Sequence, residues 1–244
     1  MKQKKQLEVL ITSGGTISRI DDVRHVGNFS SGTTGMQIAE AFLKAGHKVI
    51  YVYGKGSKRP FRERMKLNPS MRFDEEVDRL RRVYIEYYDN KDRLEEYRIE
   101  TFQDYYDSLE SLLKNRKIDV AVLAAAVSDY SATRQEGKIS SDLDEMAIKM
   151  VRNPKVISKV KEWNPNLYLV GFKLLANVPK DELLRVAQEA NRKNNADLTV
   201  ANSIYPGKFV RKDLYFVSGN NVEQVSEFKL AEKLVEEVEK RHKR

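Results

Sequence analysis

The stretch that decides the fold runs from a strand to a helix. Val9-Leu-Ile-Thr12 leads into the turn Ser13-Gly-Gly-Thr16, and Asn28-Phe-Ser-Ser-Gly-Thr-Thr-Gly35 precedes the run MQIAEAFLKAG at residues 36–46. A short apolar run beside glycines predicts a buried strand, and the apolar spacing of residues 36–46 predicts a helix. A helix start presents unpaired N–H groups and the positive end of the helix dipole, which favour phosphate. The second turn adds hydroxyls and a permissive backbone at Ser30, Ser31 and Gly32. This stretch predicts an anion or nucleotide site.

Other interpretations of these turns stay open at this point. Glycine and serine are common in ordinary loops, and serine often caps helices. The dinucleotide pattern GxGxxG and the P-loop pattern GxxxxGK are absent, and the second strand, residues 48–54, ends without the acidic residue that binds ribose in NAD sites. A short-chain dehydrogenase needs a lysine four residues after its tyrosine, whereas Tyr130 is followed at that spacing by Arg134. An NAD(P)-dependent Rossmann-type oxidoreductase is therefore the disfavoured alternative.

Length and composition favour a soluble, cytoplasmic protein in one domain. At 244 residues, 41% of them hydrophobic, the chain can bury a substantial core. No apolar run approaches the roughly 20 residues that a membrane span needs, and the charged N-terminus leads directly into a strand, so we expect no membrane attachment. There is no cysteine, and the spacing of the three histidines does not suggest a metal site. We expect no resident metal, and Mg²⁺ would arrive with a phosphate substrate.

The order of predicted elements indicates an α/β fold, a Rossmann-like, mostly parallel sheet with helices on both faces. A polar segment at about residues 55–95, which we call the charged insert, interrupts the alternation and contains a helical pattern at residues 73–88. Two further strand patterns flank Gly219-Asn-Asn221, which predicts a C-terminal hairpin, and a helix follows. We expect one domain over residues 1–244. The remaining strands are predicted at residues 97–102, 118–126, 167–172 and 197–202, and the remaining helices at 103–115, 154–163, 180–193 and 228–244.

Ligands bind open parallel sheets at the carboxyl ends of the strands. Small and polar residues follow several predicted strands: Gly14 and Gly15 after the first, then Ala124, Ala125, Ala126 and Asp129 after the fourth, and Asn202 at the end of the sixth. The three alanines would let a flat base lie against the backbone, although tight packing explains them equally well. The rule predicts that these separate segments meet in one place.

The net charge is +8, and part of it is concentrated in the charged insert. Between Lys55 and Lys66 there are six cationic residues and one acidic residue, Glu63. Such a cluster suits nucleic acid, which makes a basic nucleic-acid-binding module a second alternative. Because no reading helix or stacking motif accompanies the cluster, we interpret it as a solvated loop and expect no nucleic-acid partner.

Eight short motifs in order carry a resemblance to a known family. They are LITSGGT, IDDVRHVGNFSSG, AAAVSDY, GKIS, KMVRNPKVI, LVGFKL, KNNADL and VAN, between Leu10 and Asn202. This series resembles the phosphopantothenate-cysteine ligases of coenzyme A synthesis. The spellings KISS, KVKEWNP and GFKLL are similar to the free-standing bacterial type, in which no flavin-binding decarboxylase is fused.

The resemblance implies a two-step reaction. The carboxylate of 4'-phosphopantothenate attacks the α-phosphate of a nucleotide, which releases pyrophosphate and leaves an acyl-nucleotidylate. The amine of L-cysteine then displaces the nucleotide. The bacterial branch implies CTP rather than ATP as co-substrate, with Mg²⁺. It also implies a homodimer in which a flap from one subunit reaches the site of its neighbour.

The resemblance also assigns residues. It implies that Asn28 serves the second half-reaction and that Lys138, on a flap, serves the first. Arg24, Asn28 and Val127 are assigned to the substrate. The resemblance implies nucleotide-binding roles for Ala124, Ala125, Ala126, Asp129, Asn153, Pro154, Lys155, Val156, Phe172 and Lys193. To these we add the residues that the two turns predict for the nucleotide site, Gly14, Gly15, Ser30, Ser31 and Gly32.

Overall fold

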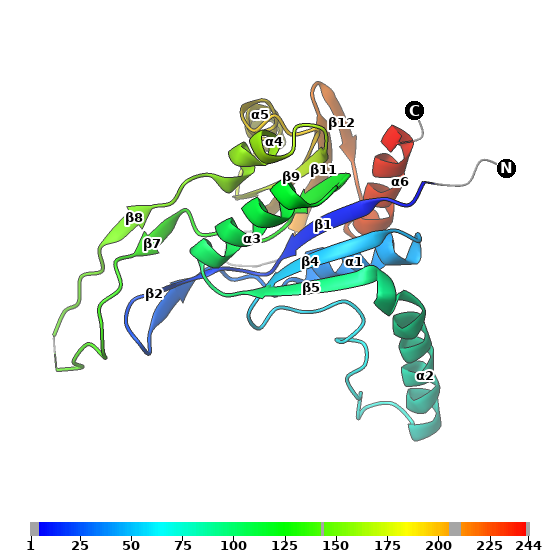
Figure 1. Ribbon diagram of the computed structural model, residues 1–244, viewed down its shortest axis with the longest axis horizontal. Helices are drawn as coiled ribbons and strands as arrows, with labels where there is room; N and C mark the ends of the chain where they lie inside the picture. Colours follow the sequence, from blue (N-terminus) through cyan, green and yellow to red (C-terminus); the bar gives the residue numbers. More distant parts are fainter. Residues whose placement is uncertain (1–4, 143, 205–210, 243–244) are drawn as a thin grey trace.

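A computed structural model describes residues 5–142, 144–204 and 211–242 (Figure 1). Its centre is an eight-stranded sheet in the order β12-β11-β10-β9-β6-β1-β4-β5. The strands from β5 to β10 are parallel, and β11 and β12 are antiparallel to their neighbours. The predicted Rossmann-like sheet is confirmed. The strand bounds are Glu8–Ser13 for β1, Lys48–Gly54 for β4, Leu94–Ile99 for β5, Val120–Leu123 for β6, Tyr168–Ala176 for β9, Leu198–Ile204 for β10, Arg211–Ser218 for β11 and Asn221–Gln224 for β12.

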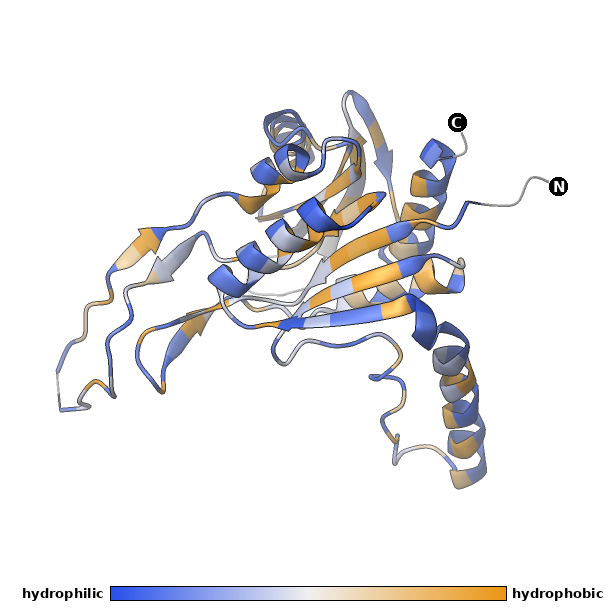
Figure 2. Cartoon of the chain, in the orientation of Figure 1, coloured by the Kyte–Doolittle hydropathy of each residue, from blue (hydrophilic) through white to orange (hydrophobic). Residues whose placement is uncertain are grey.

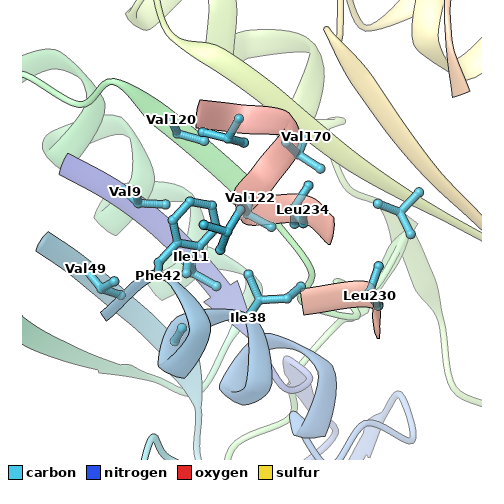
Figure 3. Packing of buried hydrophobic residues seen from close by; sticks show 14 of the residues in the cluster. Val9, Ile11, Ile38, Phe42, Val49, Val120, Val122, Val170, Leu230 and Leu234 are labelled. Atoms are coloured by element: carbon cyan, nitrogen blue, oxygen red, sulfur yellow. The ribbon is translucent and has the colours of Figure 1, made fainter. Parts of the chain in front are cut away.

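Helices cover both faces of this sheet because alternate strand residues point in opposite directions. In β1, Val9 and Ile11 join the cluster under α1 and α6, whereas Leu10 joins the cluster under α3 and α4. Figure 3 shows Ile38 and Phe42 of α1 and Leu234 of α6 gathered over the first of these faces. The helix bounds are Thr33–Lys44 for α1, Phe102–Asn115 for α3, Val160–Trp163 for α4, Lys180–Lys193 for α5 and Leu230–His242 for α6.

Two helices begin at other residues than predicted. The first begins at Thr33, inside the glycine-rich turn, because Gly32 takes the left-handed φ of 75° that suits a glycine before a helix. The helix predicted over residues 154–163 is a 3-10 turn, Val156–Lys159, followed by the short α4. In this segment Val156 and Val160 are both buried in the core.

The predicted C-terminal hairpin is present and places the last helix. Strands β11 and β12 pair in antiparallel register around Gly219, whose φ is 58°. Two reversals bring β12 parallel to β10, so its end lies at the carboxyl edge of the sheet. The 3-10 turn Glu227–Lys229 and α6 therefore start at the same edge as α1.

Two small hairpin-like sheets project from this edge and were not predicted. One pairs β2, Ile17–Arg19, with β3, His25–Gly27, and the other pairs β7, Tyr130–Ala132, with β8, Met150–Arg152. Together we call them the hairpin arm; Figure 1 shows it extending away from the sheet. Each strand has three residues, too few for a recognisable alternation of apolar and polar side chains.

The charged insert forms ion pairs rather than a free basic loop. Its helix α2, Phe73–Asn90, confirms the predicted helical pattern. Arg59 binds Glu96 at 2.6 Å, and Arg64 bridges Glu40 at 2.8 Å and Glu86 at 2.7 Å. These carboxylates neutralise part of the cluster that suggested nucleic-acid binding. Figure 2 shows apolar residues concentrated on the sheet strands and mixed with polar ones on α2. Within the described residues, no helix has the length and apolar character to cross a membrane.

Candidate active site at the carboxyl edge of the sheet

The site lies where strand order changes direction. From β1 the chain adds β4 and β5 on one side, and β6 starts the other side, so the loops after β1 and β6 leave the sheet together. Three hydrogen bonds join these loops: Ala126 N donates to Gly14 O at 2.7 Å, Ala125 N to the Thr12 hydroxyl at 3.1 Å, and Ser128 N to the Thr16 hydroxyl at 3.2 Å. These bonds fix the loop after β6 against the loop after β1.

The turn before α1 packs on the same point. The Asn28 amide donates to Ala126 O at 3.3 Å, and the Ser13 hydroxyl donates to Gly32 O at 3.0 Å. Gly32 is the N-cap of α1 and, as a glycine, has no side chain to cap this helix. An uncapped helix start beside two serines offers backbone and hydroxyl donors to an anion.

The glycines allow the two turns to pack closely, because a side chain at either position would clash. A Cβ on Gly15 would lie 2.9 Å from the Asn28 carbonyl oxygen, and one on Gly32 would lie 2.9 Å from the Ser13 hydroxyl. Gly14 is buried beneath the turn. The sequence predicts that Gly32 lets a ligand approach; the structure adds that Gly15 and Gly32 let the two turns approach each other.

A cleft of about 1260 Å³ opens above these turns. It is lined by α1 and the turn before it, the loop after β6, parts of β9 and β10, and the start of α6. The predicted site residues on its wall are Asn28, Ser30, Ser31, Gly32, Ala124, Ala125, Ala126, Val127, Asp129, Lys155 and Phe172. The strand-end rule thus brings together segments that are up to about 140 residues apart.

The charged pair on the cleft wall is Asp129 with Lys155, whose side chains form an ion pair. Asn153 holds the loop that carries Asp129: its amide donates to Ser128 O at 2.9 Å, and its backbone N–H donates to Asp129 O at 2.9 Å. Both charged side chains are more than half exposed. A lysine and a carboxylate are therefore available to a phosphate and a hydroxyl or amino group in the cleft.

Other predicted residues lie elsewhere. Asn153 and Pro154 line a separate cavity of about 510 Å³ against β2, β7 and α3. Val156 is buried in the core under α3 and α4. Lys193 ends α5 just before β10 begins, which is the amino edge of the sheet, so the structure does not bring it to the cleft of this chain.

Arg24 and Lys138 both lie on the hairpin arm. The Arg24 guanidinium binds the Asp21 carboxylate at 2.9 Å and the Ile139 carbonyl at 3.1 Å. Lys138 is exposed and is not among the residues that line the cleft. The predicted reactive lysine and the predicted nucleotide site are thus in different parts of one chain.

Sequence reasoning missed the α6 side of the cleft. Glu227, Phe228 and Glu232 line it, and Phe228 is 97% exposed. The predicted hairpin carried the signal, because two reversals return the chain to the carboxyl edge before the last helix. Among the described residues, no group of three or more His, Asp or Glu side chains is placed to hold a metal ion.

A family model described as the C-terminal domain of DNA/pantothenate metabolism flavoproteins matches residues 4–78 and 85–241. The chain belongs to this family. Its resemblance to phosphopantothenate-cysteine ligases is also confirmed by relatives bearing that name. The ligase CAB2 of Saccharomyces cerevisiae is 29% identical over 261 residues, which cover 89% of this chain and 70% of the relative.

Other relatives are larger. The coenzyme A biosynthesis bifunctional protein CoaBC of Methanocaldococcus jannaschii is 29% identical over 98% of this chain, and that of Thermococcus kodakarensis is 30% identical over 95%. The chain spans about half the length of these curated relatives, 52% and 51%. The free-standing bacterial type therefore stays a prediction.

Two solved structures share the fold. The DNA/pantothenate metabolism flavoprotein from Streptococcus pneumoniae has a TM-score of 0.77 and 28% identity, covering 97% of this chain and 100% of that one. A mutant of Cab2 in complex with phosphopantothenate-cysteine has a TM-score of 0.78 and 26% identity, covering 97% and 86%.

Proposed function

We propose that this protein is a ligase that joins 4'-phosphopantothenate and L-cysteine to form 4'-phosphopantothenoyl-L-cysteine in coenzyme A synthesis. The observation that carries the proposal is the cleft at the strand-order switch, which gathers eleven of the predicted site residues in a chain of this family. The names of the relatives support the same reaction.

The reaction has two balanced steps. A carboxylate oxygen of 4'-phosphopantothenate attacks the α-phosphorus of the nucleotide, and the bond to pyrophosphate breaks. The cysteine nitrogen then attacks the acyl carbon, the bond to the nucleoside monophosphate breaks, and the amine releases a proton. Both steps crowd anions together, so positioning and positive charge contribute most to the rate.

Within the cleft, the start of α1 would hold phosphate oxygens through Ser30, Ser31 and Gly32. Lys155, which lines the same cleft, would add a positive charge. The loop with Ala124, Ala125 and Ala126, together with Phe172, would contact the base, and Val127 would contact the acyl substrate. We leave Lys193 out of this assignment because it lies at the other edge of the sheet.

Asn28 stands between the two loops where the acyl group would lie. Its amide is oriented by the Ala126 carbonyl at 3.3 Å, and an amide both donates and accepts hydrogen bonds. We assign it to the second step, in which it would donate to the acyl oxygen and accept from the incoming amine.

Lys138 would serve the first step by offsetting charge on the phosphates. Because it lies on the hairpin arm rather than on the cleft wall, we propose a homodimer in which it reaches the cleft of a second copy. We propose CTP as co-substrate, with Mg²⁺ entering on its phosphates, and action in the cytoplasm.

Mass spectrometry of the products tests this function. With 4'-phosphopantothenate, L-cysteine and either CTP or ATP, we expect 4'-phosphopantothenoylcysteine and the nucleoside monophosphate, faster with CTP. If product formed with ATP and not with CTP, the assigned co-substrate would be wrong. No product with either nucleotide would reject the ligase.

A further inference from the structure

The turn between β2 and β3 is built around a buried carboxylate. Asp21 is 0% exposed. One carboxylate oxygen accepts the backbone N–H groups of Val23 at 2.8 Å and Arg24 at 2.6 Å, which closes the turn. The other oxygen accepts the Ile139 N–H at 3.1 Å and the Arg24 guanidinium at 2.9 Å. The same side chain therefore serves two loops that are 118 residues apart.

These contacts enclose Lys138 from both sides. After it, Ile139 is fixed by both backbone groups: its N–H donates to Asp21, and its carbonyl accepts from Arg24 at 3.1 Å. Before it, the Gly137 carbonyl accepts from Asp22 N at 3.1 Å. The Lys138 side chain itself is exposed. The peptide that carries the lysine is anchored while its ammonium group remains accessible.

Electrostatics keep this anchor charged. Burial alone would raise the pKa of the Asp21 carboxyl group, but the N–H groups of Val23, Arg24 and Ile139 and the charge of Arg24 outweigh it and lower the pKa. A buried carboxylate with four donors is a strong acceptor that neither an amide nor an alkyl group replaces.

We propose that Asp21 is a positioning residue for the first half-reaction, which fixes the Lys138 loop on the β2–β3 turn so that the ammonium is presented to the phosphates at one place. The proposal rests on the proposed function of Lys138. It gives the reactive lysine a fixed anchor on the hairpin arm instead of a freely moving loop.

The first test is Asp21→Asn, with Asp22→Asn as the matched control. In Asp21→Asn an amide that donates would face the Ile139 N–H and the Arg24 guanidinium, which also donate. Asp22 is the next residue, and among the described residues its side chain pairs with exposed Arg134. We expect Asp21→Asn to lower the rate of pyrophosphate release about 10-fold to 10²-fold, to leave CTP affinity unchanged, and to reduce hydrogen-exchange protection at residues 137–139. Asp22→Asn should match the wild type in all three.

A second variant changes the other partner of the hydrogen bond, Ile139. Ile139→Pro removes the N–H that Asp21 accepts and also restricts the backbone of residues 138 and 139, whereas Ile139→Ala keeps the N–H. We expect Ile139→Pro to reproduce the loss of rate with CTP affinity intact, and Ile139→Ala to keep the rate.

Three outcomes would overturn the proposal. The first is that Asp21→Asn changes neither the rate of pyrophosphate release nor the exchange protection of residues 137–139. The second is that both Asp21→Asn and Ile139→Pro lose CTP binding and thermal stability together, and the third is a normal rate in Ile139→Pro. Failure of the proposed function is separate, because wild-type protein would then release no pyrophosphate, while exchange at residues 137–139 would still decide whether Asp21 anchors the loop.

Discussion

The cleft and the hairpin arm are held together by different kinds of interaction. The cleft lies at the ends of long, buried parallel strands, and backbone hydrogen bonds and glycine contacts hold its loops. The arm consists of three-residue strands, with β8 exposed along its length, and depends on side-chain contacts such as those of Asp21. The sheet therefore fixes the position of the cleft, and the arm fixes the position of Lys138, the lysine to which we assign the first half-reaction. Neither region completes the proposed chemistry alone.

The largest expected effect concerns Lys138, the arm's contribution. Lys138→Ala should lower pyrophosphate release about 10²-fold or more, even without cysteine, since it removes an electrostatic stabiliser of the first step. Lys149→Ala, an exposed lysine on the same segment, is the control and should keep the rate. Melting temperatures of both variants should match the wild type. A large drop for Lys138→Ala would mark a structural lysine instead.

The second prediction concerns Asn28, which lines the cleft. Asn28→Asp removes the donor to the Ala126 carbonyl and puts a negative charge beside the acyl phosphate. We expect one round of pyrophosphate release, accumulation of the acyl-nucleotidylate, and turnover lower by about 10²-fold. Mass spectrometry of the quenched reaction detects the intermediate. Normal turnover, or a folded, CTP-binding variant that forms no intermediate, would contradict the role.

Lys155 tests binding within the cleft. Lys155→Ala should weaken CTP affinity about 10-fold, because it removes a charge-assisted contact to phosphate worth roughly 1.5 kcal/mol. Stability should change little, since the exposed pair with Asp129 contributes about 1 kcal/mol or less. Lys159→Ala is the control: Lys159 pairs with Glu162 and does not line the cleft. Equal titration curves for both variants would remove Lys155 from the site.

The smallest effect is the response of the arm to acid. Because the folded state lowers the pKa of Asp21 below its usual 3.8, the carboxylate stabilises the arm at and above that pH. This contribution is lost only as the pH falls through the lowered value. Protection of residues 137–139 should therefore be constant from pH 7 to about 5 and decrease only in stronger acid. A loss of protection near pH 6 would point to another group.

The sequence was sufficient to predict the features that follow from periodic burial. The parallel sheet, the hairpin at Gly219, helix α2 and the convergence of Ala126, Asp129 and Asn202 all follow from strand and turn patterns and the strand-end rule. Individual roles of these residues still stay predictions.

The rest depends on contacts that no local pattern records. The strands of the arm are too short and too exposed to show a period, and Asp21 reads as an ordinary turn residue until Ile139 is beside it. The assignment of Lys193 to the nucleotide rests on a motif alone, whereas the structure places this lysine at the amino edge because α5 leads into the parallel strand β10. The basic cluster suggested a solvated loop, since Glu40, Glu86 and Glu96, which pair with it, lie outside it in sequence.

One measurement tests most directly whether the cleft of one copy and the arm of another form a single active site. Differently tagged Asn28→Asp and Lys138→Ala chains are co-expressed, and the mixed dimer is purified by both tags. If Lys138 acts across the dimer, one of the two sites is intact, and turnover should be about half that of the wild type, whereas each parent variant remains about 10²-fold lower. A mixed dimer no more active than its parents, or no mixed dimer at all, would contradict the shared site.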